Sequence, residues 1–295
     1  DRSINPYRGC EHGCIYCFAR PTHAYLGLSP GLDFETRILF KPEAAKLLEA
    51  ELASPKYRCD IVAMGTNTDP YQPVERDLKI TRSILRVLSD FNNPVGIVTK
   101  NHLITRDIDI LGDMARRNLA EVFLSVTTLD KTLARDMEPR ASAPHRRLDA
   151  IRALSAAGIP TGVMTAPMIP GLNDHEMEAI LEKATEAGAT RAGFTVVRLP
   201  LEIKDLFDEW LRTNRPDRAE KVLSLIRQLR GGTLNSAQFG QRMRGEGPIA
   251  QLLSARFAAA FPAATSPRLV ASSSARSSGR MPAASRATAI AVDRR

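Results

Sequence analysis

Cysteine is scarce in this 295-residue sequence, and long apolar runs are missing from it. No stretch of 18 or more apolar residues occurs, so the sequence predicts no transmembrane helix. Residues 1–20 carry charged side chains and three cysteines where a secretory signal would have an apolar segment. We therefore expect a cytoplasmic protein without a membrane partner. The first residue is Asp1 rather than Met, which leaves an upstream start open.

The four cysteines stand at positions 10, 14, 17 and 59. A framework of disulfides normally uses more cysteines, spread along the chain. Three of these four lie within eight residues, and clustered thiols in a cytoplasmic protein are typical of metal binding. The sequence therefore predicts a metal site near its beginning.

Basic residues are not spread evenly along the sequence. The net charge is +8, but residues 265–295 contain six Arg and one Asp, which account for +5 of it. The remaining +3 belongs to residues 1–264. Nucleic-acid binding by the folded part is therefore only weakly supported by charge.

Short apolar runs alternate with helical patterns from residue 60 onward. The runs cover 60–65, 94–99, 121–126, 160–166 and 191–197. Between them apolar residues recur at helical spacing, for example over Val74–Phe91 and Pro144–Ala157. This alternation is typical of βαβ units, and it predicts an α/β fold with a parallel sheet. In such sheets the functional residues lie at the carboxyl ends of the strands.

We expect three parts along the chain. Residues 1–200 form the core, and 201–262 form a helical C-terminal extension of the same domain. Residues 263–295 are rich in Ala, Ser, Pro and Arg without periodicity, which predicts a disordered tail. Within the extension, the charged and glycine-rich segment 241–247 could line a substrate entrance, bind an anion or simply connect two helices.

The segment Gly9-Cys-Glu-His-Gly-Cys-Ile-Tyr-Cys17 has the spacing C-x3-C-x2-C. Three thiolates in so short a loop can converge on one metal centre, and soft sulfur ligands suit iron–sulfur clusters and zinc. Three cysteines leave one iron of a cubane cluster open to a small molecule. A structural zinc would need a fourth ligand, for which His12 and Cys59 are the candidates. We expect His12 to be a plain loop residue and Cys59 a small buried residue at the start of a strand.

This motif, with Tyr16 directly before its last cysteine, resembles the signature of the radical S-adenosylmethionine (SAM) enzymes. Over roughly residues 3–200 the chain is similar to that superfamily, and most similar to its spore photoproduct lyase-like branch of DNA repair photolyase-like proteins. The resemblance implies a partial (β/α)6 TIM-like barrel, with Ser3–Pro6 left from the first strand. It also implies a [4Fe-4S] cluster on Cys10, Cys14 and Cys17, SAM as the second cofactor, and an electron donor such as flavodoxin or ferredoxin.

The resemblance further implies SAM contacts at the strand ends. Thr68 stands at a serine that helps to hold SAM in the lyase branch, and Lys100 matches a lysine that reaches the SAM carboxylate. Ser125 matches a serine near SAM, and Ala166 a backbone contact at the adenine. Each has a plainer alternative as a turn residue, a solvated cation or a partner of neighbouring backbone. Glu75 could contact SAM or cap the next helix.

The sequence departs from the lyase branch at one position. Thr66 replaces a cysteine that donates hydrogen to the product radical, and an alkyl O–H bond is too strong for that role. Tyr71 could donate instead or could merely pack. We expect an enzyme that cleaves SAM to a 5′-deoxyadenosyl radical for hydrogen abstraction from a substrate that the sequence leaves open. A nucleic-acid repair lyase and a non-catalytic iron–sulfur or zinc module are the alternatives.

Overall fold

The computed structural model describes residues 2–238, 240–261 and 288–291. Its main sheet has the strand order β1-β4-β5-β6-β7-β8, and each neighbouring pair is parallel. The strands are β1 (Arg2–Ile4), β4 (Val62–Met64), β5 (Val95–Thr99), β6 (Ala120–Ser125), β7 (Thr161–Met168) and β8 (Arg191–Val196). The predicted α/β fold is therefore confirmed: it is a parallel sheet of the partial TIM-barrel type.

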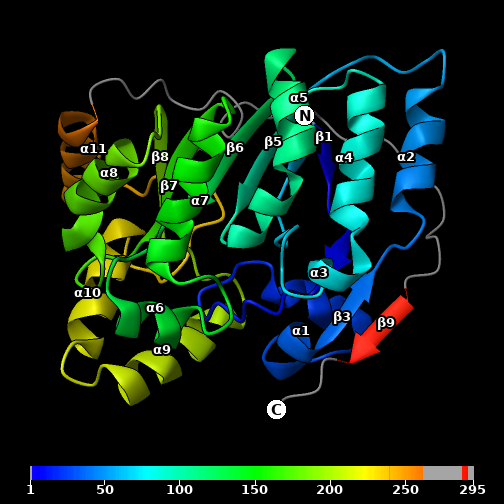
Figure 1. Ribbon diagram of the computed structural model, residues 1–295. Coiled ribbons are helices and arrows are strands. Elements are labelled where there is room, and N and C mark those ends of the chain that lie inside the picture. Colours follow the sequence, from blue (N-terminus) through cyan, green and yellow to red (C-terminus); the bar gives the residue numbers. More distant parts are fainter. Residues whose placement is uncertain (1, 239, 262–287, 292–295) are drawn as a thin grey trace.

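The connecting helices lie along the outside of this sheet (Figure 1). They are α2 (Ala44–Leu52), α4 (Ile80–Asp90), α5 (Ile108–Arg116), α7 (Pro144–Ala156) and α8 (Met177–Glu186). In α4 the apolar residues recur every three or four positions, so Ile84, Leu85 and Leu88 are all fully buried against the sheet. The strands are apolar on both faces because helices cover one face and loops at the site cover part of the other.

The helix predicted over Val74–Phe91 is two helices. A short α3 (Glu75–Leu78) ends at Lys79, whose φ of 52° is left-handed, and α4 begins at Ile80. The Glu75 carboxylate accepts hydrogen bonds from the backbone N–H groups of Thr81 (2.9 Å) and Arg82 (3.3 Å). These are among the free donors at the start of α4, so Glu75 caps that helix.

A second, antiparallel sheet contains β2 (Tyr7–Arg8), β3 (Arg37–Phe40) and β9 (Thr288–Ala291). The predicted disordered tail, 263–295, lies outside the described residues except for β9. Those four residues pair with β3, whose other edge pairs with β2, and the disordered tail stays a prediction.

The carboxyl ends of the parallel strands face the lower half of Figure 1. Around them lie η1 (Arg20–Leu26), α1 (Leu32–Thr36), η2 (His102–Asp107), α6 (Lys131–Met137) and η3 (Asp174–Glu176). The described part of the predicted extension holds α9 (Ile203–Asn214), α10 (Ala219–Leu229) and α11 (Gly247–Ala260). Phe207 of α9 and Val222 of α10 share a buried core with Cys14 and Tyr16, so the extension closes over the cysteine loop. No helix among the described residues has the length and apolar character needed to cross a membrane.

Candidate cofactor site at the carboxyl edge of the sheet

The loop of residues 9–17 follows β2 and lies at this carboxyl edge. Its thiols are free: Cys10 and Cys14 are buried and Cys17 is half-buried. The loop is held by backbone bonds from Cys10 N to Phe34 O (2.9 Å) and from Ile15 N to Met137 O (3.0 Å). Distant segments therefore fix where the three thiols lie.

Two further features explain the local turn. Gly13 has a φ of +67°, a left-handed conformation that other residues rarely adopt, so glycine is favoured there; a Cβ would also displace the ends of the Arg140 and Glu35 side chains. The Arg20 side chain is 1% exposed and donates to the carbonyls of Gly13 and Cys14, each at 2.9 Å. It also pairs with Glu35 at 2.6 Å. Arg20 thus supports the cysteine loop from inside.

The electrostatics of the thiols fit a positively charged centre. Burial raises the pKa of Cys10, as do the charges of Asp69, Cys14 and Cys17, while the Asp69 N–H group lowers it. Burial, followed by the charge of Glu138, raises the pKa of Cys14 to about 12. The three thiols are close enough to oppose one another's ionisation. A bound metal centre would reverse this and stabilise the thiolates.

The arrangement gives no support to a mononuclear zinc site. Within the described residues, no three His, Cys, Asp or Glu side chains converge on the position of a single metal ion. A tetrahedral zinc needs such convergence, because every ligand lies within about 2.3 Å of one ion. Thiolates that bind separate irons of one cluster surround a larger object, so they need not converge in this way.

Asp69 joins the cysteine loop to the loop after β4. Its carboxylate accepts from Thr99 Oγ1 (2.7 Å) and from the backbone N–H groups of Lys100 (2.7 Å) and Tyr71 (2.9 Å). Asp69 Oδ2 also lies 3.4 Å from His12 Nδ1. Sequence reasoning assigned no role to Asp69, since most of its partners lie far from it along the chain.

His12 is more than a plain loop residue. It is 1% exposed, and its Nε2 lies 3.3 Å from Asn101 Nδ2. Burial lowers its pKa to about 4, so the imidazole is neutral at pH 7. His12 therefore bridges the cysteine loop to Asp69 on one side and to the end of β5 on the other.

Gln72 clamps the same two loops from another direction. Its Oε1 accepts from Glu11 N (2.9 Å), and its Nε2 donates to Gly9 O (3.2 Å). Glu11 in turn accepts from the N–H group of Val74 at 2.5 Å. Reciprocal bonds of this kind fix the distance between the cysteine loop and the segment that carries Thr68.

On the opposite side of the cysteine loop, Tyr16 and Arg147 both donate to the buried carboxylate of Glu138. Burial alone would raise the pKa of Glu138, but the charges of Arg147 and Lys100 and these hydrogen bonds lower it to about 2. The ammonium group of Lys100 lies 5.9 Å from the centroid of the Tyr16 ring. Sequence reasoning missed Glu138 and Arg147, because no motif marks them.

The four predicted SAM-contact residues all lie at this edge. The hydroxyl of Thr68 donates to Tyr7 O (2.9 Å), and the hydroxyl of Ser125 donates to Ala166 O (3.0 Å). Ser125 and Ala166 thus contact each other directly. The hydroxyl protons of Thr68 and Ser125 are engaged by backbone, and Lys100 leaves its ammonium group without a hydrogen bond or ion pair among the described residues.

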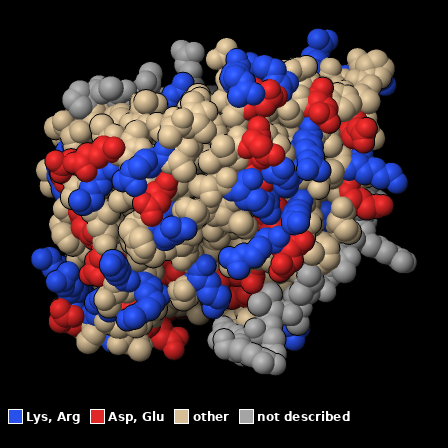
Figure 2. Space-filling model, in the orientation of Figure 1, with Lys and Arg blue, Asp and Glu red and all other residues tan. Residues whose placement is uncertain are grey.

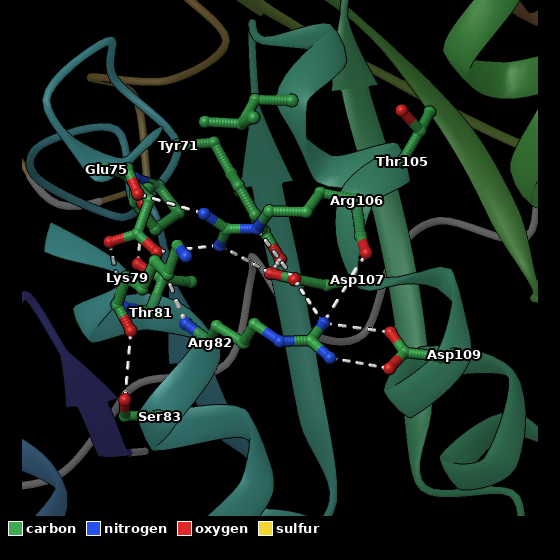
Figure 3. A network of polar contacts seen from close by, with 12 residues as sticks. Tyr71, Glu75, Lys79, Thr81, Arg82, Ser83, Thr105, Arg106, Asp107 and Asp109 are labelled. Carbon is green, nitrogen blue, oxygen red and sulfur yellow. Dashed lines mark hydrogen bonds and ion pairs between the residues drawn. The ribbon is translucent and has the colours of Figure 1, made fainter. Parts of the chain in front are cut away.

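Tyr71 is buried, as its packing alternative predicted, whereas Cys59 is not. The buried hydroxyl of Tyr71 donates to Asp107 at 3.1 Å, within a network of ion pairs (Figure 3), which argues against a hydrogen-donor role. Cys59 is exposed and precedes β4, so the prediction of a buried residue was wrong. The chain stays on the surface there until Val62 enters the sheet.

Comparison with known proteins supplies the family. The radical SAM superfamily model matches residues 4–184, which is more than half of the chain. The chain belongs to the radical SAM superfamily. An uncharacterized protein of Mycobacterium tuberculosis is 38% identical over 230 residues, covering 77% of this chain and 67% of the relative. An uncharacterized protein of Methanocaldococcus jannaschii is 30% identical over 173 residues, covering 59% of this radical SAM chain and 62% of the relative.

Solved structures give the same fold. A point variant of spore photoproduct lyase superposes with a TM-score of 0.56 at 15% identity, covering 89% of this chain and 74% of the lyase. The lyase in complex with a dinucleoside spore photoproduct gives a TM-score of 0.54 at 16% identity and covers 72% of this chain. The superposition spans about three fifths (61%) of that lyase chain. The recognition of a radical SAM protein is therefore confirmed, and its fold is similar to that of spore photoproduct lyase.

Proposed function

We propose that this chain is a radical SAM enzyme with a [4Fe-4S] cluster on Cys10, Cys14 and Cys17. The observation that carries the proposal is the set of three free, clustered thiols at the carboxyl edge of a parallel sheet in a radical SAM chain. When bound, the cluster supplies the electron that cleaves SAM to methionine and a 5′-deoxyadenosyl radical, which abstracts hydrogen from a substrate. An external donor such as flavodoxin or ferredoxin would provide that electron.

The chain's own part is to bind, orient and exclude water. Phe207 and Val222 belong to the same buried core as Cys14, and this core limits the access of water to that thiol. Lys100 supplies a positive charge beside that loop, suited to the SAM carboxylate. Thr68, Ser125 and Ala166 border the same space, and the hydroxyl oxygens of Thr68 and Ser125 can still accept hydrogen bonds from SAM.

The test is anaerobic reconstitution with iron and sulfide, followed by dithionite and SAM, with 5′-deoxyadenosine measured by mass spectrometry. The wild type should bind four irons and form 5′-deoxyadenosine, whereas Cys14→Ala should lose both iron and product. Cys59→Ala is the matched control, because Cys59 is exposed and lies outside the motif. Circular dichroism should show that both variants fold.

Two results would count against the proposal. Zinc in place of iron, with metal lost in Cys59→Ala, would establish the structural zinc module instead. Four irons without SAM binding or 5′-deoxyadenosine would establish a non-catalytic iron–sulfur module. As a finer probe, Lys100→Met should weaken SAM binding about tenfold, the usual effect of losing one charged contact. Lys79→Met is the control, because Lys79 lies on an exposed turn, and it should leave SAM binding unchanged.

Nucleic-acid repair remains the second candidate because of the likeness to the lyase fold. Two observations favour another substrate. Thr66 holds the position of the lyase branch's cysteine, and Lys and Arg are interspersed with Asp and Glu on the face in Figure 2 rather than gathered in a basic stripe. Repair of a dinucleoside photoproduct by the reconstituted wild type would restore the lyase assignment.

A further inference from the structure

Three arginines meet where β8 ends. Arg198 follows β8 by two residues, and Arg230 and Arg242 both stand within electrostatic range of it. The segment 241–245 reaches this place because Val196 N donates to Met243 O at 3.0 Å. The charged, glycine-rich segment noted in the sequence therefore lies at the same sheet edge as the cysteine loop.

Arg198 is oriented by an aromatic ring. Its guanidinium carbon lies 3.9 Å from the centroid of the Phe18 ring, and Phe18 directly follows Cys17. Within the part of the chain that the structure describes, the guanidinium makes no hydrogen bond or ion pair. Phe18 is 38% exposed, so this ring is not sealed in the core. A stacked guanidinium keeps its five N–H donors free for a ligand in its plane.

Arg230 is buried, and no carboxylate of the described residues lies at hydrogen-bond distance from it. It is 3% exposed and donates to the carbonyls of Val197 (2.5 Å) and Gln241 (3.1 Å), while its Nε has no partner. Burial and the charge of Arg198 lower the pKa of Arg230 to about 10, against the opposite effect of Glu246. Burial and then Arg242 likewise lower the pKa of Arg198, while Cys17 raises it. Among the described residues, neither Arg198 nor Arg230 has a carboxylate at hydrogen-bond distance to compensate its charge.

We propose that Arg198, with Arg242 beside it, binds a phosphate or carboxylate group of the substrate next to Cys17. This proposal rests on the proposed function, since it places the substrate at the same edge as the cofactors. The planar fork of an arginine matches two oxygens of either group, and the two groups share this chemistry. Arg230 acts as a positioning residue, because its bonds to Val197 and Gln241 join β8 to the segment that carries Arg242.

The position suits a group at the far end of a substrate. Arg198 stacks on Phe18, and Phe18 directly follows Cys17 in the sequence. An anion bound to Arg198 would therefore be held close to the cysteine loop without itself binding the cluster. Binding energy from such a remote group can orient the reacting carbon. Substrates with a phosphate or carboxylate a few bonds from the reacting carbon are thus favoured over neutral ones.

The experiment titrates the cluster-loaded full chain with inorganic phosphate and, separately, with acetate. Isothermal calorimetry is run anaerobically, with chloride replaced so that ionic strength stays constant. At least one anion should bind, and Arg198→Gln should weaken that binding about tenfold or more, the usual effect of losing charged hydrogen bonds. Arg198→Lys keeps the charge but loses the planar guanidinium, so its affinity for the anion should lie between those of the wild type and Arg198→Gln. Arg244→Gln is the control, because this exposed arginine lies on the same segment.

Each outcome decides the proposal. Equal affinity in the wild type and Arg198→Gln, or binding of neither anion, overturns it. Competition between phosphate and SAM, with weaker SAM binding in Arg198→Gln, also overturns it, since the site would then belong to the cofactor. Failure of the proposed function looks different: the wild type would bind the anion but form no 5′-deoxyadenosine.

Discussion

Buried and half-buried arginines occur at both sides of the candidate cofactor site, but their partners differ. Beside β4 and β5, Arg82 and Arg106 meet the carboxylates of Glu75, Asp107 and Asp109 (Figure 3). At the end of β8, Arg198 meets an aromatic ring and Arg230 meets carbonyl oxygens. Carboxylate-paired arginines hold elements together, because removing a partner leaves an uncompensated buried charge. Arginines without carboxylates have charge left for a ligand.

The paired side is a framework for the loop that follows β4. Glu75 accepts from Tyr7 and Arg106 and caps α4, so one carboxylate joins β2, α3, α4 and η2. Asp107 is fully buried and accepts from Arg82 (2.7 Å), Arg106 (2.8 Å) and Tyr71 (3.1 Å). With its partners satisfied, this network has little capacity left for a ligand.

The largest effect is therefore expected for Asp107→Ala. It leaves the Tyr71 hydroxyl without its acceptor and takes one of two carboxylate partners from Arg82 and from Arg106, so it should lower the free energy of unfolding by about 3–5 kcal/mol. Urea unfolding at pH 7 measures this. Asp113→Ala is the control: its ion pairs with Arg116 and Arg117 are on the surface and should contribute about 0.5 kcal/mol or less. A loss at Asp107 no larger than at Asp113 would contradict the framework role.

Glu138→Gln sharpens the comparison through pH. The lowered pKa of Glu138, about 2, means that its carboxylate stabilises the fold fully above its ordinary pKa of 4.5, and that this stabilisation is lost as the pH falls toward 2. At pH 7 the variant should be less stable by about 2–3 kcal/mol, and this difference should shrink as the pH falls below 4.5 and approach zero only near pH 2. Unfolding at both pH values measures it.

The control for that experiment is Glu178→Gln. Glu178 also pairs with an arginine, Arg256, but its carboxylate is 45% exposed, so solvent screens the pair. Its substitution should change stability little at either pH. A difference for Glu138→Gln that stays constant from pH 7 to pH 3 would show that its charge is not what stabilises the fold.

The sequence predicted the sheet and the cysteine loop for physical reasons. Apolar runs such as 94–99 signal a buried strand wherever they occur, and the cysteine spacing is itself local. By contrast, the roles of Asp69, Glu138 and Arg147 depend on partners far along the chain. Nothing near Glu138 indicates that Tyr16, 122 positions away, donates to it. The local sequence likewise did not indicate β9, because its partner strand β3 lies more than two hundred residues earlier.

The smallest effect is expected for Arg230→Met, and it tests the comparison most directly. Arg230 is as buried as Arg147, at 3% and 1% exposure, but it bonds only carbonyl oxygens among the described residues. Removing it strands no carboxylate and relieves the repulsion with Arg198, so the free energy of unfolding should fall by about 1–2 kcal/mol, the cost of unsatisfied carbonyls. Arg147→Met should cost about 3–5 kcal/mol, because the charge of Glu138 stays behind, buried. Equal losses in urea unfolding would mean that the arginines at β8 stabilise the fold as much as the paired ones do. A clearly smaller loss of unfolding free energy for Arg230→Met than for Arg147→Met would show that the arginines at β8 contribute less to folding, so that their charge remains available to bind a ligand.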